Sequence, residues 1–587
     1  MVRTLTWVLV GIVAYTVVAM ALKARGRLPE SVRVSGPITT LHTKRGRAFL
    51  NWLATPKRFW RAWGNFGLGV TLVVMVGSFA LVIVSGLQAL DQPEQTPIRN
   101  PQNVLVIPGV NDFLPLAAAP EIVFGLLVGL VVHEGGHGLL CRVEDIEIDS
   151  MGLALFAIIP IGAFVQPDEQ SRIEASRGSQ SRMFAAGVTN NFLITAVAFA
   201  LLFGPVAGSV AVASGAPIGS VANGSSADGA GIGYGDVITS VDGQAVTDGA
   251  QLRQRLDAAR GETVEIGLKN GSTRTVDRVP LLSVTSPVVE NLSLDPSDPP
   301  VIRSVNGTAV HTERDVAAAF TERTVVSLET DQGTATFPVG AYAVRIDDGG
   351  PLADAGAPTD GPLIVTHVGG QRVANTSALD RVTDGFEPGQ TVTVVAYDDG
   401  VRDEYNVTLA AAESGDGTVI GVRVIPGYSA LEIDDFGTDI YPAGQFLGLL
   451  GGGDNPIGNP IQQIVSVLFM PFFSTVPGIA YNFAGFLPTV TNFYTVTGPL
   501  AALGNGVFLL ANVLFWTAWV NLNLGFFNCI PTFPLDGGHI LRASTESLVA
   551  RLPVGDGRRL TTALTVSVSL VMIGGLVLMV FGPQLVG

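Results

Sequence analysis

The sequence predicts an α-helical membrane protein with about six transmembrane helices and a large α+β region inserted among them. Of its 587 residues, 47% are hydrophobic and only 14% are charged, which is too apolar for an ordinary soluble protein. Runs of about 20 apolar residues recur along the chain, and a helix of that length can cross a bilayer. Residues 211–436 instead alternate short β-like runs with glycine and aspartate turns.

Charge is distributed very unevenly along the chain. The net charge is -16, and residues 211–436 alone hold 32 acidic and 14 basic residues. Residues 23–64 hold ten Lys or Arg and one Glu. The positive-inside rule therefore places this basic loop in the cytoplasm and the acidic insert outside a plasma membrane that the chain crosses several times. Because the basic cluster adjoins membrane spans, nothing indicates nucleic-acid binding.

The first two expected spans enclose the basic loop. The first, residues 5–22, lacks the small-residue cleavage pattern of a signal peptide, so we expect an uncleaved helix. The second covers residues 66–90. Together with the basic loop they form an N-terminal two-span hairpin, residues 1–95, which we expect to be a separate part of the protein.

Residues 96–207 form the first half of the predicted core. The third span, residues 122–141, ends inward at Arg142. The apolar segment 151–169 contains Pro160 and Gly162, so we expect a short strand or re-entrant loop packed against protein, since unpaired backbone cannot face lipid. The fourth span, residues 183–206, contains "GVTNNF" and returns the chain to the outside.

The remaining spans lie near the C-terminus, in residues 504–587. They cover residues 506–527 and 562–581, and the loop between them is rich in arginine. The preceding region, 437–503, is apolar but full of Pro and Gly. If the insert is outside and the arginine-rich loop inside, this region crosses an even number of times. A re-entrant element, an amphipathic surface segment and two short crossings all satisfy that condition.

The insert contains an internal repeat. A turn rich in Gly and Asp, a strand, a "V(D/G)G" turn, a helix and a further strand occur once after residue 216 and again after residue 342. A partial third copy, "PPVIRSVNGTAVHTERDVAAAF", lies between them. This order resembles tandem PDZ domains of the circularly permuted, protease-associated kind. The resemblance implies one such domain at 211–290, and the partial repeat with a second domain at 291–425.

The third span contains "HEGGH", and three titratable residues within five positions are unusual in a membrane helix. On a helix His133 and His137 lie one turn apart on the same face, so both imidazoles can reach one metal ion. Glu134 can then accept a proton from a water that the metal activates. Zinc suits such ligands when one position stays open for water. The alternative is a pair of hydrogen-bonded histidines at a helix interface, but ionisable groups inside a membrane are usually functional.

Two glycines, Gly135 and Gly136, separate the histidines. They could admit a closely approaching backbone, such as a substrate or the 151–166 strand. Simple packing of small residues between helices explains them equally well.

A zinc site with two histidines needs a third protein ligand. Asp536 follows the fifth span, in "NLNLGFFNCIPTFPLDGGHIL", at a break rich in Pro and Gly and at a depth similar to His133. An Asp-Gly turn after a membrane helix would explain "LDGG" alone, but the neighbouring His-Glu motif favours a ligand. For His539, two glycines further on, we expect a solvated turn residue, with a ligand role as the alternative.

The combination of "HEGGH" and "NCIPTFPLDGG" resembles the site-2 protease family of intramembrane zinc metalloproteases. "IPIGAFV" and the Gly187 and Asn191 of "GVTNNF" also match family elements. The resemblance implies that His133, His137 and Asp536 bind one Zn²⁺ ion, that Glu134 is the general base, and that Asn528 orients the substrate or intermediate.

The sequence thus predicts an intramembrane zinc endopeptidase that cuts transmembrane segments of membrane proteins. Its expected partners are these substrate proteins and the surrounding membrane lipid. The family resemblance also implies an upstream, site-1-type protease that makes the first cut. The charge asymmetry places the active site towards the cytoplasm. A non-catalytic PDZ membrane scaffold with a vestigial metal site is the alternative, although the intact motif residues disfavour it. The two cysteines, at the ends of apolar segments, predict buried thiols and no disulfide.

Overall fold

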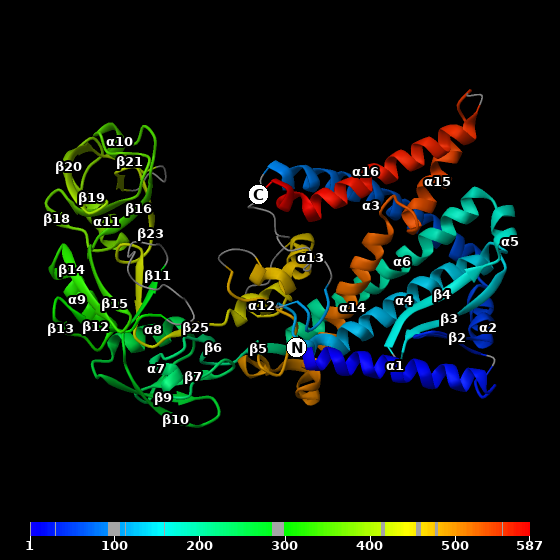
Figure 1. Cartoon of the computed structure of the whole chain (residues 1–587), viewed down its shortest axis with the longest axis horizontal. Coiled ribbons are helices and arrows are strands. Elements are labelled where there is room, and N and C mark those ends of the chain that lie inside the picture. Colours follow the sequence, from blue (N-terminus) through cyan, green and yellow to red (C-terminus); the bar gives the residue numbers. More distant parts are fainter. Residues whose placement is uncertain are drawn as a thin grey trace. The chain divides into compact units, whose positions relative to one another are not determined.

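The computed structural model describes residues 2–29, 31–91, 106–111, 113–157, 159–284, 299–412, 417–453, 459–475, 479–553 and 556–586. The chain divides into two compact units. We call residues 1–211 and 444–587 the helical unit and residues 212–443 the insert unit. Figure 1 shows the long helices of the first and the small sheets of the second.

Three helices form the centre of the helical unit. Helices α4 (Ala119–Val143), α6 (Arg177–Leu201) and α14 (Gly506–Asn528) pack pairwise against one another, and α3 (Lys57–Asp91) packs on α6 and on α16 (Gly557–Val586). The unit also contains α1 (Val2–Ala24), α2 (Lys44–Leu53), η3 (Leu116–Ala118), α5 (Glu169–Glu174), η4 (Leu202–Val206), η5 (Ala207–Ser209), β5 (Val210–Val212) and α15 (Asp536–Val549).

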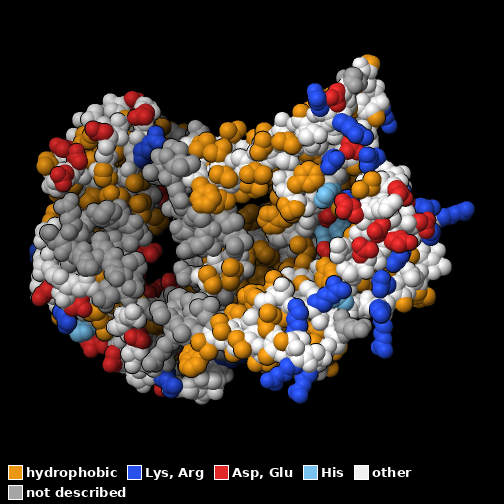
Figure 2. Space-filling model, turned by 45° about the vertical axis from the view of Figure 1, so that its right-hand side comes forward, with side chains coloured by type: hydrophobic (Ala, Val, Ile, Leu, Met, Phe, Trp, Pro, Cys, Tyr) orange, Lys and Arg blue, Asp and Glu red, His pale blue; other side chains and the backbone are white. Residues whose placement is uncertain are grey.

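The described residues contain five helices that are long and apolar enough to cross a membrane. They coincide with the five expected spans after the first. For that first span, expected at residues 5–22, the structure adds a shorter apolar stretch, Val10–Ala24 of α1. Many side chains exposed on α3 and α16 are large and apolar, and hydrophobic side chains cover much of the face in Figure 2. A surface of this kind suits lipid, so the chain is a multi-pass membrane protein.

Glycines on α4 let its neighbours approach closely. A Cβ atom at Gly125 would lie 2.8 Å from the carbonyl oxygen of Trp516 on α14. At Gly136 it would lie 2.7 Å from the carbonyl oxygen of Ala186 on α6. Gly136 thus serves helix packing, whereas a Cβ at Gly135 would meet nothing within 4 Å. The two central glycines of "HEGGH" therefore have different surroundings.

A four-stranded antiparallel sheet lies beside α4. Its order is β1-β2-β3-β4, with β1 at Val32–Ser35, β2 at Ile38–His42, β3 at Ile148–Phe156 and β4 at Ile159–Pro167. The segment expected as one strand or re-entrant loop is therefore a two-stranded hairpin that extends a hairpin of the basic loop. Helix α2 contacts both α4 and β3, so the sheet and α2 enclose the C-terminal half of α4.

The region 437–503 contains short elements, and its described residues include no span-length helix. Asn482 donates its side-chain amide to the carbonyl oxygens of Phe113 and Pro471, which ties this region to the start of α4. The elements are β25 (Thr438–Ile440, part of the insert unit), α12 (Ala443–Leu449), α13 (Pro460–Phe469), η6 (Met470–Thr475), η7 (Thr491–Phe493), β26 (Tyr494–Val496) and η8 (Gly498–Leu503).

The insert unit repeats one sheet order twice. The first sheet runs β10-β9-β7-β6-β25 and the second runs β20-β19-β17-β16-β23, with a short strand added to the third position of each. In both, the last strand of the order comes from later in the chain, as in a circular permutation. Between them β13-β12-β14-β15 form a smaller sheet with its own hydrophobic core around Phe320.

The elements of the first module are β6 (Ala216–Val221), α7 (Ser226–Gly229), β7 (Val237–Val241), β8 (Gln244–Ala245), α8 (Gly249–Ala258), β9 (Thr263–Leu268), β10 (Thr273–Asp277) and β11 (Leu281–Val284). Those of the middle module are β12 (Ile302–Val305), β13 (Thr308–Ala309), α9 (Glu313–Glu322), β14 (Val325–Thr330) and β15 (Gly333–Pro338). The rest of the unit contains β16 (Ala341–Ile346), α10 (Pro351–Asp354), β17 (Leu363–Val368), β18 (Gln371–Arg372), α11 (Thr376–Thr383), β19 (Thr391–Asp398), β20 (Val401–Thr408), β21 (Ala410–Ala411), β22 (Thr418–Val419), β23 (Val422–Ile425) and β24 (Leu431–Asp434).

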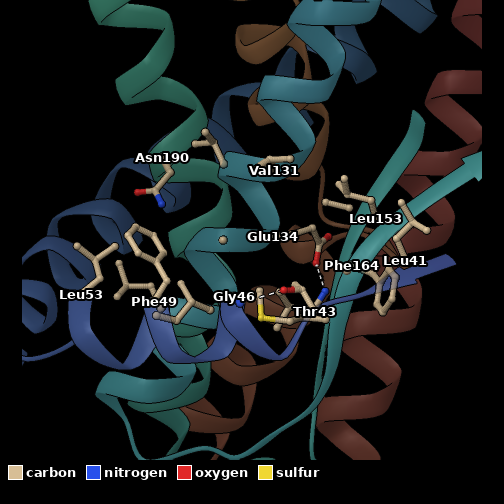
Figure 3. A pocket seen from close by; sticks show the side chains of 18 of the residues that line it. Leu41, Thr43, Gly46, Phe49, Leu53, Val131, Glu134, Leu153, Phe164 and Asn190 are labelled. Carbon is tan, nitrogen blue, oxygen red and sulfur yellow. Dashed lines mark hydrogen bonds between the residues drawn. The ribbon is translucent and has the colours of Figure 1, made fainter. Parts of the chain in front are cut away.

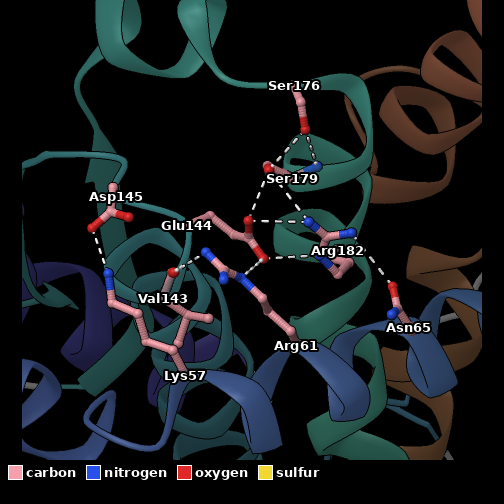
Figure 4. A network of polar contacts seen from close by, with 9 residues as sticks. All are labelled: Lys57, Arg61, Asn65, Val143, Glu144, Asp145, Ser176, Ser179 and Arg182. Atoms are coloured by element: carbon pink, nitrogen blue, oxygen red, sulfur yellow. Dashed lines mark hydrogen bonds and ion pairs between the residues drawn. The ribbon is translucent and has the colours of Figure 1, made fainter.

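One buried carboxylate joins three helices at the end of α4 (Figure 4). Glu144 accepts two hydrogen bonds from Arg182 on α6, at 2.9 and 3.0 Å, and one from Ser179 at 2.8 Å. Arg61 on α3 approaches the same carboxylate at 3.4 Å. Burial raises the pKa of Glu144, but these contacts outweigh it and hold the pKa below its usual value.

We predict that Glu144→Ala lowers the free energy of unfolding of the purified protein by about 3 kcal/mol, since it leaves the Arg182 guanidinium without its partner. The depressed pKa means that the contribution of Glu144 is complete at neutral pH and is lost as the pH falls from about 4.5 through the folded pKa. Denaturant titrations at pH 7 and at a series of pH values from 5 down to 3 measure both effects.

The matched control is Lys57→Ala. Asp145 pairs with Lys57 at 2.6 Å, but both side chains are exposed, so we expect a change below about 1 kcal/mol. Equal destabilisation by the two variants would contradict a special role for the buried carboxylate.

Candidate metal centre

Three ligand atoms converge inside the helical unit. His133 and His137 lie one turn apart on α4, and Asp536 is the first residue of α15. The two histidine Nε2 atoms are 3.2 Å apart, and Asp536 Oδ2 lies 3.1 Å from the first and 3.2 Å from the second. All three side chains are buried, and within the described residues they form the one cluster of three or more His, Cys, Asp or Glu suited to a metal.

The cluster fits a zinc ion. Zinc binds nitrogen and oxygen ligands at about 2.0–2.2 Å in a tetrahedron, whose edges are then about 3.3–3.6 Å. The three separations, 3.1–3.2 Å, are slightly shorter than that edge. When both imidazoles are neutral and carry their proton on Nδ1, the carboxylate oxygen and the two Nε2 atoms all present lone pairs, and a cation between them would satisfy all three acceptors. Two histidines and one carboxylate leave the fourth position open, as catalytic zinc sites require.

Backbone and amide contacts orient both imidazoles. His137 Nδ1 lies 2.8 Å from the Met183 carbonyl oxygen, which can only accept a hydrogen bond, so Nδ1 carries the proton and Nε2 keeps its lone pair. His133 Nδ1 lies 3.4 Å from the side-chain amide nitrogen of Asn191. The Oδ1 atom of that amide is buried, with no partner among the described residues. Exchanging the amide nitrogen and oxygen would let Oδ1 accept from His133 Nδ1–H.

A glycine on α6 makes room for the two rings. A Cβ atom at Gly187 would lie 2.7 Å from His137 Nε2 and 2.9 Å from His133 Cε1. The sequence marked Gly187 and Asn191 only as matches to family elements. The structure shows that both face the metal cluster, one by leaving space and one by approaching a ring nitrogen.

Asp536 reaches the cluster because α14 ends at Asn528 and a tight turn leads into α15. Gly537 and Gly538 pack directly on this turn, where a Cβ atom would lie 2.4 Å from the carbonyl oxygen of Ile530 and 2.6 Å from the carbonyl carbon of Thr532, respectively. The sequence predicted the break after the span. It did not predict the helix that begins at Asp536, and that helix directs the carboxylate inward.

Glu134 lies next to the cluster in sequence but makes a different contact. Its Oε2 atom accepts a hydrogen bond of 2.9 Å from the backbone N–H of Val165 on β4. The carboxylate is half-buried and borders a cavity of about 620 Å³, seen from close by in Figure 3. The glutamate is therefore free of the ligand cluster and open to a bound molecule.

Two further polar residues lie nearby in the sequence. Asn528 is half-buried and donates its amide to the carbonyl oxygen of Leu524 in its own helix, so its role towards substrate stays a prediction. His539 belongs to helix α15 and not to a solvated turn. Its ring stacks on Phe184 at 4.4 Å and meets Phe533 edge-on, apart from the three-residue cluster.

The model of peptidase family M50 matches residues 121–574. The chain belongs to this family, the site-2 proteases. A curated relative, the zinc metalloprotease RasP of Oceanobacillus iheyensis, is 26% identical over 187 residues, which cover 32% of this chain and 39% of the relative. The chain thus matches about two fifths of that relative's length.

A solved PDZ domain of the SdrC-like protein Lmo2051 from Listeria monocytogenes covers 15% of this chain and 87% of its own, at 18% identity and a TM-score of 0.13. That likeness is too low to carry an argument. Family membership supports a zinc metalloprotease in general, and the predicted resemblance to site-2 proteases is confirmed.

We predict that Gly187→Ala lowers zinc affinity at least tenfold, because the added methyl group displaces both imidazoles. Metal analysis of the purified protein after competition with a chelator measures the loss. Gly204→Ala is the control, since a Cβ there meets nothing within 4 Å. Unchanged zinc affinity in the Gly187 variant would show that the rings tolerate the methyl group.

Asp536→Ala should lower zinc occupancy more strongly, because it removes one of three ligands. Asp536→His should retain part of the metal, since imidazole also binds zinc. The same competition assay applies. Full zinc occupancy in the alanine variant would exclude Asp536 as a ligand.

Proposed function

We propose that this protein is an intramembrane zinc endopeptidase that hydrolyses peptide bonds within transmembrane segments of other proteins. The observation that carries the proposal is the convergence of His133, His137 and Asp536 inside a bundle of span-length helices, with Glu134 on the same helix as two of the ligands. Membership of peptidase family M50 and the likeness to a zinc metalloprotease support it.

The ligands would hold one zinc ion, which when bound lowers the pKa of a water molecule and polarises a peptide carbonyl. Glu134 accepts the proton of the attacking water and returns it to the departing amine. Its half-buried position beside the cavity lets a substrate reach it. Met183 and Asn191 hold the imidazoles in place, and Asn528 is the further residue proposed to orient the substrate or intermediate.

The substrate has to present an extended segment, because the carbonyl groups of a helix are hydrogen-bonded and shielded. Strand β4 lies at the edge of its four-stranded sheet. Its Val165 N–H points to Glu134 and not to another strand. A substrate strand added along this edge would run past the catalytic glutamate.

The proposed topology follows from charge. The basic loop, the ligand cluster and the loop before α16 lie towards the cytoplasm, and the insert unit lies outside, in a multi-pass plasma membrane protein. There the PDZ-like modules act as a docking gate or size filter for substrates that a site-1-type protease has already cut. A non-catalytic scaffold remains the competing function, and bound zinc with turnover distinguishes the two.

We expect Glu134→Gln to retain zinc and fold and to lower cleavage by about 10³-fold or more, because the water loses its base. The measurement is product formation by purified protein together with metal content. Cleavage at the wild-type rate would exclude Glu134 as the base, and absence of cleavage by the zinc-loaded wild type towards any membrane substrate would favour the scaffold.

Single cysteines test the orientation. Cys141 and Cys529 are buried, so labelling by a membrane-impermeant thiol reagent should be low in the parent. Asp242→Cys should react in intact cells, and Arg45→Cys only after the membrane is opened. Labelling of both positions from the same side would refute the proposed topology.

A further inference from the structure

The cavity beside Glu134 has walls from two parts of the chain. Helices α4 and α6 and the β3–β4 hairpin supply one part, within the residues that match the peptidase family. Strand β2, helix α2 and the start of α3 supply the other, with Phe49, Leu53 and Trp60 among its residues, all before the matched region begins at residue 121. Figure 3 shows Phe49 and Leu53 on α2, with Val131 and Glu134 on the neighbouring helix.

The lining of this cavity is mostly hydrophobic. It includes Phe49, Leu53, Val131, Leu153, Phe164 and Leu193, and among the polar side chains are Glu134 and Asn190. Asn190 already accepts a hydrogen bond of 3.0 Å from the Trp63 indole. At about 620 Å³ the cavity is as large as pockets that hold small molecules, so one or two large side chains fit within it. Its chemistry therefore suits an apolar guest.

The position of the cavity argues for a guest that belongs to the substrate. A peptide bond under attack must lie about 3–3.5 Å from the attacking atom, which Glu134 deprotonates. Successive residues of an extended strand rise about 3.3 Å and point to alternate faces. A side chain within two residues of the scissile bond must therefore lie close to Glu134, and the cavity is the open space on whose wall that carboxylate stands.

Gly135 leaves the floor of the cavity open. It lines the cavity beside Glu134, and a Cβ atom there would meet nothing within 4 Å. Gly136, one residue later, is packed against Ala186 instead. A side chain at position 135 would thus occupy cavity space without displacing a helix.

We propose that α2 completes a specificity pocket that accepts a large hydrophobic side chain, such as Leu or Phe, next to the scissile bond of the substrate. The proposal rests on the proposed endopeptidase function and names the substrate preference of that same site. Phe49 and Leu53 are the specificity-determining residues, and Gly135 sets the depth of the pocket. Selectivity then depends on an N-terminal segment outside the family match.

The test uses full-length, zinc-loaded protein and a transmembrane substrate whose cleavage site has been mapped by mass spectrometry. Each of three positions on either side of the scissile bond is changed in turn to Ala, Leu or Phe, and kcat/KM is measured. We expect one position at which Leu or Phe is preferred over Ala by about 10-fold to 200-fold, the range that a hydrophobic pocket can deliver.

Two variants change the volume of the pocket in opposite directions, and both should weaken its preference for a large side chain. Gly135→Leu should reduce the preference for Phe over Ala at that position at least tenfold, because its side chain fills the pocket. Phe49→Ala should weaken the preference for Leu over Ala by removing part of the wall. The controls are Gly77→Leu on α3, where a Cβ also meets nothing within 4 Å, and Asn51→Ala, which is exposed on α2 and does not line the cavity. Both controls should keep the wild-type selectivity.

A binding measurement tests the same contact without turnover. A substrate that carries a photoreactive benzoylphenylalanine at the selected position should crosslink to α2 in Glu134→Gln protein, and peptide mapping locates the bond. Crosslinks confined to other elements would overturn the proposal. Measuring zinc content in each variant shows whether the metal site is intact, and if Gly135→Leu loses zinc, Phe49→Ala and the crosslink decide.

Different results would overturn the endopeptidase function and the specificity pocket. A zinc-loaded wild-type protein that cleaves no substrate overturns the endopeptidase function and the pocket with it. Cleavage with the same Phe-to-Ala ratio in wild type, Gly135→Leu and Phe49→Ala overturns only the pocket. A lipid chain in the cavity would give that flat ratio together with rates that depend on acyl-chain length.

Discussion

Three lone pairs meet at about 3.2 Å from one another between α4 and α15: the Nε2 atoms of His133 and His137 and the Oδ2 atom of Asp536. When both imidazoles are neutral and carry their proton on Nδ1, such an arrangement is unfavourable without a cation, because all three atoms are acceptors. It is especially costly in a membrane helix bundle, where bulk water does not surround the three atoms. Much of the helical unit can be understood as a means of keeping this cluster in place.

The packing around α4 follows from that requirement. Small residues where α4 crosses its neighbours let α6 and α14 approach closely, and Gly187 lets the imidazoles fill the space between α4 and α6. Beyond the cluster, Glu144 clamps the end of α4 to α6 through Arg182. The positions of the histidines thus depend on the close packing of α4 against α6 and on the Glu144–Arg182 ion pair at the end of α4.

Beside Glu134, the surface of α4 faces an open cavity and is not packed against another helix. Glu134 accepts a hydrogen bond from an edge strand and borders a hydrophobic cavity, while the ligands stay enclosed. The basic loop contributes to that cavity through α2, so a segment that the sequence offered only as a topological marker becomes part of the site's surroundings. Its hydrophobic face shapes the cavity, whereas its charge is the basis of the proposed orientation in the membrane.

The sequence by itself determined the helical membrane character, the positions of five spans, the repeat within the insert, and the residues that form the ligand cluster. Hydrophobic runs and residue spacing are local properties, and an i, i+4 pair on a helix is close in any fold. Only the tertiary structure decided that Asp536 begins a helix, that His539 stacks on Phe184, that Gly136 is packed while Gly135 is open, and that the 151–166 segment is a hairpin joined to the basic loop. These features depend on which segments, distant in the sequence, pack against one another. Hydropathy and local residue spacing do not predict that packing.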